Sequence, residues 1–142
     1  GNRAPKVHAE KARALYRKIH GAIQKGLIRS CHDCSAGGLG VALAETAFAG
    51  GLGMEVFLGK VPQSGLRRND FILFSESQSR FVVTIDPTKK KALEELLGDT
   101  IYGEVGLITE GEIFRVTGLQ KKTVIETNIF DLKEAWQKPL RF

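Results

Sequence analysis

Two short segments of this sequence carry the residue types needed to bind a polar ligand. The first runs from His32 to Leu39 and reads His-Asp-Cys-Ser-Ala-Gly-Gly-Leu. Gly37 and Gly38 lack side chains where a helix is expected to begin, so its free N–H groups and dipole would favour an anion such as phosphate. Asp33 and Ser35 stand beside the glycines as metal-directed, hydroxyl-directed or capping groups. The alternative is that Ser35 only caps the helix and the glycines only permit close packing.

The second segment is the polar run Ser75–Arg80, which separates two apolar stretches. A tight hairpin would normally use Asn-Gly or another glycine-containing pair. This run instead offers a carboxylate, hydroxyls, an amide and a guanidinium, from Glu76, Ser77, Gln78 and Arg80. Such groups suit a polar ligand or a domain interface, and the alternative is an ordinary exposed loop.

The cysteines and histidines give no comparable signal for catalysis or metal binding. A redox Cys-x-x-Cys pair normally opens a helix in a thioredoxin-like pattern, whereas Cys31 and Cys34 precede the glycines. A zinc site would need two more ligands, which only distant histidines could supply. His32 and Asp33 are adjacent, and neighbours on a strand point to opposite faces. We therefore assign no catalytic residue and no metal ligand.

Helices and strands alternate along the chain that must position these segments. Helical spacing of apolar residues, among them Ala12, Leu15, Tyr16, Ile19 and Ile23, predicts a first helix over residues 7–26. A second helix, residues 36–49, is apolar nearly all round and is therefore expected to be buried on more than one side. Strands are predicted over residues 27–31, 54–58, 71–74, 80–85, 101–109, 113–117 and 123–129.

Two further helices are predicted from their start signals. Asp86 as N-cap and Pro87 at the first helical position open one, and Gly98 closes it. Asp131 with Glu134 forms a capping box for a short last helix, in which Ala135 and Trp136 would face inward. This mixture of elements predicts an α+β, layered α/β/α-type domain with a mixed sheet.

Composition limits the class of protein. The chain has 142 residues, 42% apolar and 26% charged, which suits one domain over residues 1–142. No apolar run spans a bilayer and the N-terminus lacks a signal peptide, so we expect no membrane partner. Two cysteines suggest a reduced, cytoplasmic protein. The net charge of +5 suits solvated helix faces, and aromatic residues are not interleaved with the basic ones, so no nucleic-acid partner is expected.

The two polar segments together resemble a known family. The run His32-Asp33-x-Ser35-x-Gly37-Gly38-Leu39, followed by Ala42-Leu43-Ala44-Glu45, resembles the glycine-rich segment of the large subunit of phosphoribosylformylglycinamidine synthase. Phe74–Phe81 is similar to a second signature in the same domain. The match is to the C-terminal-type domain of that subunit's second repeat, which is related to the C-terminal domain of aminoimidazole ribonucleotide synthetase.

The resemblance implies a function for a larger enzyme. With ATP and Mg²⁺, that enzyme would activate the amide oxygen of formylglycinamide ribonucleotide, and glutamine-derived ammonia would displace phosphate to form the amidine. Its partners would be upstream ATP-binding domains, a glutaminase subunit or domain, and a small accessory subunit. This domain would bind no cofactor alone, lack activity alone, and line the substrate or nucleotide cleft.

The same resemblance leaves a rival open. The chain is expected to be a domain excised from a longer protein, with substrate- or nucleotide-binding residues among Asp33, Ser35, Gly37, Gly38, Glu76, Ser77, Gln78 and Arg80. The alternative is a stand-alone, non-catalytic module of the same fold that binds a ligand or assembles with other proteins.

Overall fold

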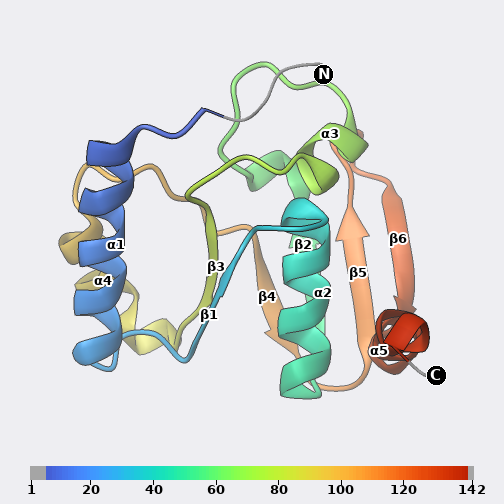
Figure 1. Ribbon diagram of the computed structural model, residues 1–142. Helices are drawn as coiled ribbons and strands as arrows, with labels where there is room; N and C mark the ends of the chain where they lie inside the picture. The colour runs from blue at the N-terminus through green and yellow to red at the C-terminus, as the bar shows by residue number, and fades with distance from the viewer. Residues whose placement is uncertain (1–5, 141–142) are drawn as a thin grey trace.

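A computed structural model describes residues 6–140, in which helices and strands form layers (Figure 1). The helices are α1 (Ala9–Gln24), α2 (Gly38–Gly50), α3 (Asn69–Phe74), α4 (Lys90–Leu97) and α5 (Ile129–Gln137). The strands are β1 (Ser30–Asp33), β2 (Gly53–Phe57), β3 (Phe81–Thr84), β4 (Gly106–Thr109), β5 (Ile113–Thr117) and β6 (Thr123–Asn128). The predicted α+β layered class with a mixed sheet is confirmed.

The strands form two sheets. The larger has the order β4-β2-β5-β6, in which β2 and β5 are parallel and the other pairs are antiparallel. The smaller is an antiparallel ribbon of β1 and β3. In Figure 1 the ribbon runs between the α1–α4 pair and the larger sheet. The ribbon therefore connects two packed regions of the molecule.

The main core lies between α2 and the larger sheet. Alternation places Met54 and Val56 of β2 with Phe114 and Val116 of β5 on the face toward α2, where Leu43 is also buried. The opposite face carries Arg115, which contacts Glu55 and Glu126 on the two neighbouring strands. Six residues of α2 are buried, so the prediction of a helix covered on more than one side is confirmed.

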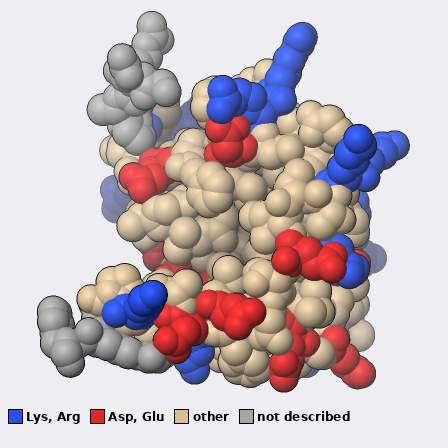
Figure 2. All heavy atoms as spheres, turned by 90° about the vertical axis from the view of Figure 1, so that its right-hand side faces the viewer, with Lys and Arg blue, Asp and Glu red and all other residues tan. Residues whose placement is uncertain are grey.

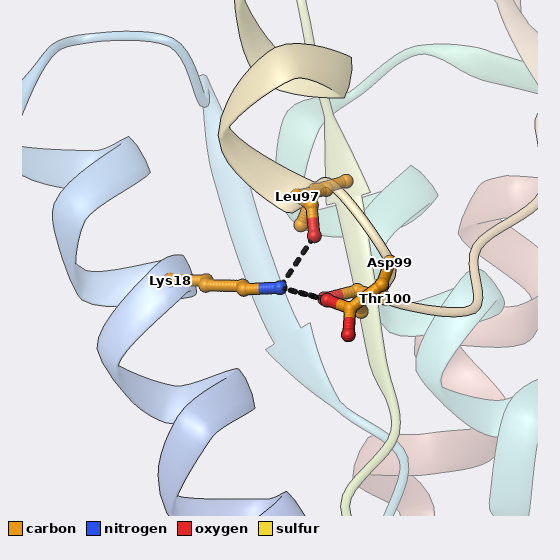
Figure 3. A network of polar contacts seen from close by, with 4 residues as sticks. All are labelled: Lys18, Leu97, Asp99 and Thr100. Atoms are coloured by element: carbon orange, nitrogen blue, oxygen red, sulfur yellow. Dashed lines mark hydrogen bonds and ion pairs between the residues drawn. The ribbon is translucent and has the colours of Figure 1, made fainter.

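A second, smaller core joins α1 and α4. Ala22, Leu27, Leu93 and Leu97 are its buried members. The predicted helix start at Asp86-Pro87 is confirmed, but it opens the short 3-10 helix Pro87–Lys89 that leads into α4: Asp86 accepts the backbone N–H of Thr88, and Pro87 lies at the first position of that 3-10 helix. Lys18 of α1 binds the end of α4 and the loop that follows it (Figure 3). Its Nζ donates to Leu97 O, Asp99 Oδ1 and Thr100 Oγ1.

One strand prediction was wrong, and two others were wrong in part. Residues 71–74 lie in helix α3, because four apolar residues fit either structure and packing on α2 decides between them. The first strand begins at Ser30 instead of residue 27, since Leu27 is drawn into the smaller core. Only residues 106–109 of the predicted strand 101–109 are strand. The turn at Glu110-Gly111 joins β4 and β5, which lie on either side of β2.

Predictions at two helices also need correction. Asn128, and not Asp131, caps α5, because its side chain accepts the backbone N–H of Phe130. Ala135 and Trp136 are not buried as predicted: both are exposed, although the Trp136 ring contacts Phe48 of α2, and Ile129 is the buried residue. In α1, Tyr16 and Ile23 remain about half exposed, so the apolar stripe is wider than the surface that α4 covers.

The surface charges are mixed on the side of the molecule where β6 and α5 lie. Figure 2 shows acidic and basic side chains interspersed around a hollowed, mostly uncharged centre on this face. The basic excess is therefore not gathered into one patch on this side. Among the described residues no helix is both long and apolar enough to cross a bilayer.

Candidate functional site

The ribbon of β1 and β3 brings the two predicted polar segments together. Asp33, the last residue of β1, pairs with Phe81, the first residue of β3. The segment that precedes α2 therefore lies beside residues 75–80, although about 40 residues separate them along the chain. A cavity of about 300 Å³ lies between them. It is lined by Tyr16, Asp33, Cys34, Ser35, Ala36, Glu76, Gln78, Ser79, Arg80 and Phe81.

The start of α2 is closed by the chain itself. Glu76 Oε1 accepts the backbone N–H of Gly37 at 2.9 Å, and the N–H of Gly38 donates to Ser35 O at 3.0 Å. A Cβ on Gly38 would lie 2.7 Å from Ser75 O, and the φ of Gly38 is +66°. Both observations support the packing interpretation of the glycines. The side chain of Ser35 makes no capping hydrogen bond to this helix, whose N-cap is Gly37.

Arg80 shapes the loop in which it lies. Its Nε donates to Ser77 O at 3.2 Å, and its Nη2 donates to Ser75 O. The guanidinium therefore closes residues 75–80 into a compact turn while still lining the cavity. Ser79 adopts a left-handed conformation, with φ of +59°, which this tight path requires.

Not all of the predicted site residues border the cavity, and some of those that do also hold the loop 75–80 in shape. Asp33, Ser35 and Gln78 line it, whereas Gly37, Gly38 and Ser77 are not among its lining residues. Of the eight predicted residues, five therefore meet in one place, because Glu76 and Arg80 also border the cavity.

Tyr16 is a lining residue that sequence reasoning missed. Its hydroxyl lies 3.3 Å from Ser79 Oγ, and its ring packs edge-on to Phe81 at a centroid distance of 5.6 Å. The sequence placed it in the apolar stripe of the first helix. Only its phenolic hydroxyl, the polar end of an amphipathic side chain, could have suggested a position at the rim.

The cysteines are both free thiols, and Cys34 lines the cavity. Burial raises the pKa of Cys34 most strongly, Asp33 raises it further, and Arg80 opposes the change. Burial and then Asp33 also raise the pKa of Cys31. A reactive cysteine needs a lowered pKa, so the environment opposes thiol chemistry at either position.

His32 turns away from the cavity toward α2. Its Nε2 lies 2.8 Å from Glu45 Oε2, and its Nδ1 lies 2.7 Å from the backbone oxygen of Asp33. This contact ties β1 to α2 and indicates a structural role for the pair. In the part of the chain that the structure describes, no group of three His, Cys, Asp or Glu side chains is placed to hold a metal ion.

Comparison with known proteins identifies the family. Residues 2–118 match the family described as "AIR synthase related protein, C-terminal domain". The chain belongs to this family. Its curated relatives include the phosphoribosylformylglycinamidine synthase subunit PurL of Methanocaldococcus jannaschii, 33% identical over 94% of this chain, and that of Alkaliphilus metalliredigens, 34% identical over 96%. The chain spans only 18% of the length of each of these relatives.

Solved structures of the same family agree with the fold. Phosphoribosylformylglycinamidine synthase II of Thermotoga maritima matches 84% of this chain and 21% of its own, with 28% identity and a TM-score of 0.75. The Thermotoga maritima PurL structure described as complexed with FGAR matches 85% of this chain and 20% of its own, with 28% identity and a TM-score of 0.76. Escherichia coli HypE, at 18% identity and a TM-score of 0.63, shares the fold alone.

Proposed function

We propose that this chain serves as the C-terminal-type domain of a phosphoribosylformylglycinamidine synthase. The longer enzyme would convert formylglycinamide ribonucleotide and glutamine-derived ammonia to the amidine in purine biosynthesis. One observation carries the proposal: the two segments that resemble the synthase meet at one cavity, beside β1 and β3. The PurL relatives support it over a stand-alone module, because they match nearly the whole chain.

The domain would act by binding and positioning the substrate or nucleotide. Four polar residues that border the cavity would contact the substrate or nucleotide directly: Asp33, Ser35, Gln78 and Ser79. Glu76 would hold the start of α2 in place through its bond to the N–H of Gly37. Arg80 would hold the loop 75–80 in shape through its bonds to loop carbonyls. No residue of this chain is assigned a proton-transfer or nucleophilic role.

The cofactors and partners of the proposed enzyme would belong mainly to the rest of the longer protein. ATP would supply the phosphoryl group that activates the amide oxygen, and relatives from Thermotoga maritima were solved with ATP and ADP. Since the described residues offer no cluster for Mg²⁺, we assign no step through the metal to this chain. Upstream ATP-binding domains, a glutaminase and a small accessory subunit complete the proposal, in line with the PurLQS structure. We place the enzyme in the cytoplasm.

A domain replacement tests this proposal. Residues 1–142 would replace the matching segment of Thermotoga maritima PurL, and amidine formation would be measured with ATP, Mg²⁺ and ammonia. We expect the chimera to be active and the isolated chain to be inactive. A chimera that folds, as judged by circular dichroism, yet forms no amidine would contradict the proposal. Activity of the isolated chain would contradict the assignment of catalysis to other domains.

A further inference from the structure

The cavity between β1, α2 and the loop 75–80 lacks the backbone donors that usually hold phosphate. A helix start binds phosphate through its free N–H groups. Here Glu76 already accepts the N–H of Gly37, and Ser35 O accepts the N–H of Gly38. The backbone of Ser75 and Leu73 also covers the open side of Gly38, at 2.7 and 2.9 Å from where a Cβ would stand. A phosphate would find this helix start occupied.

The charged side chains of the cavity also disfavour an anion. Asp33 and Glu76 contribute two carboxylates, and Arg80 is the one basic residue among the lining residues that the structure describes. Two of its nitrogens, Nε and Nη2, already donate to Ser77 O and Ser75 O. A phosphate dianion would thus meet two like charges and a guanidinium of which two of the five N–H donors already bind loop carbonyls.

The remaining polar groups suit an uncharged ligand. Ser35, Ser79 and Tyr16 offer hydroxyls that can donate or accept, and Gln78 offers a carboxamide that can do both. The hydroxyls of Tyr16 and Ser79 lie 3.3 Å apart, and either can be the donor. This pair is exposed, so a ligand hydroxyl could bond to one of the two hydroxyls while water satisfies the other. Asp33, whose side chain is largely exposed, would accept a further hydroxyl proton.

We propose that this cavity binds an uncharged, hydroxyl-rich group, such as a sugar ring, and excludes phosphate through Glu76 and Asp33. The inference rests on the proposed function insofar as the cavity is taken to be part of the substrate cleft. It deepens that function by stating which portion of the substrate faces this domain. Glu76 is then a residue that determines specificity, by filling the helix start with the chain's own carboxylate.

Three probes that carry the sugar, the phosphate or both test the inference directly: ribose, inorganic phosphate and ribose 5-phosphate. Each would be titrated at millimolar concentration into the ¹⁵N-labelled chain, with amide shifts of residues 33–36 and 76–81 followed by NMR. We expect saturable shifts with ribose, weaker binding of ribose 5-phosphate, and none with phosphate. Tighter binding of either phosphate compound than of ribose would overturn the inference, as would the absence of binding by all three.

Glu76→Gln separates charge from shape. The glutamine oxygen can still accept the N–H of Gly37, so the loop is expected to keep its structure, while one negative charge is lost. Removing one unit charge near a partly solvated site changes an anion's affinity by about fivefold. We expect ribose 5-phosphate to bind about fivefold more tightly and ribose to bind unchanged. Glu110→Gln, in the distant β4–β5 turn, is the matched control.

Failure of this inference and failure of the proposed function would give different results. If Glu76→Gln weakened ribose binding, Glu76 would be a direct ligand contact, and the inference would be wrong. If ribose bound as expected but the domain-replacement chimera were inactive, the proposed enzyme would be wrong while the ligand class of the cavity stood.

Discussion

At the residue scale, Gly38 and Glu76 show how residues of a family signature can serve packing and loop structure. Gly38 resembles a phosphate-binding glycine in the sequence, yet its missing side chain makes room for the backbone of α3. Glu76 resembles a substrate contact, yet its carboxylate holds the start of α2. Gly38 is not a lining residue of the cavity, whereas Glu76 borders it and also fixes the start of α2.

Gly38→Ala is expected to destabilise the protein by about 2–4 kcal/mol. The new Cβ would stand 2.7 Å from a backbone oxygen, and the φ of +66° strains any residue with a Cβ. Gly50→Ala, at the other end of the same helix, meets nothing within 4 Å and should stabilise by about 0.5–1 kcal/mol. Urea unfolding monitored by circular dichroism measures both. Equal stabilities of the two variants would refute close packing at Gly38.

Asp86 gives a prediction about pH at the same scale. Its bonds with the Thr88 hydroxyl and N–H, and then with Arg29, lower the pKa of this carboxyl from 3.8 to about 2. Because the pKa is lower in the folded protein, its stabilising effect is present above pH 4 and is lost as the pH falls toward 2. The stability difference between the wild type and Asp86→Asn should therefore shrink between pH 4 and pH 2.

The titration of Asp86 can be measured directly by carboxyl ¹³C NMR. Thr88→Val removes the hydroxyl donor, the largest cause of the shift, so the pKa of Asp86 should rise in that variant. An unchanged pKa would mean that the capping geometry of the 3-10 helix Pro87–Lys89, which leads into α4, is not maintained in solution.

At the scale of elements, Lys18 links helix α1 to the end of helix α4. Its ammonium donates to Leu97 O at 2.6 Å, to Asp99 at 2.7 Å and to Thr100 at 2.9 Å (Figure 3). The side chain of Asp99 is 97% exposed, so the ion pair is expected to contribute little. The bond to Leu97 O matters more, because a cation at a helix C-terminus satisfies a free carbonyl and complements the dipole.

Lys18→Met is expected to cost about 1–2 kcal/mol of stability, since it removes the bond to the last turn of α4 while keeping the apolar stem. Hydrogen exchange of the amides of residues 97–100 should become faster. Lys11→Met, on the same helix but exposed, serves as the control and should change stability by less than about 0.5 kcal/mol. Asp99→Asn should have a similarly small effect; a loss as large as that of Lys18→Met would assign the stabilisation to the ion pair instead.

At the scale of the whole molecule, two cores are joined through the β1–β3 ribbon. The main core contains Val116, which is fully buried, and the smaller core contains Leu93. Val82 of β3 belongs to the main core, and Ile85, just after β3, packs on the smaller one. The ribbon therefore couples the two, and we propose that residues 1–142 fold as one cooperative domain.

Thermal unfolding tests this coupling. The ring centroids of Trp136 and Phe48 of α2 lie 5.8 Å apart, so Trp136 fluorescence reports on the main core. Far-ultraviolet circular dichroism reports on all helices. Leu93→Ala should lower stability by about 2–4 kcal/mol, and both signals should shift together. A separate early loss of helix in Leu93→Ala, with Trp136 fluorescence unchanged, would show that α1 and α4 unfold as an independent unit.

The sequence alone determined the fold class, the positions of α1, α2 and α4, and strands β2, β5 and β6 to within a residue or two at most ends. It could do so because apolar periodicity and the Asp86-Pro87 start are local signals. The two segments that meet at the cavity, His32–Leu39 and Ser75–Arg80, were also visible, since polar groups and glycines stand out against apolar neighbours.

Only the tertiary structure decided how those two segments contact each other. The sequence left open whether Gly37 and Gly38 await a phosphate or allow packing, because both need the same missing side chains. The choice depends on Glu76, about 40 residues away, whose carboxylate reaches Gly37 once β1 and β3 pair. The helical state of residues 71–74 and the rim position of Tyr16 depend likewise on contacts between distant parts of the chain, which no local pattern records.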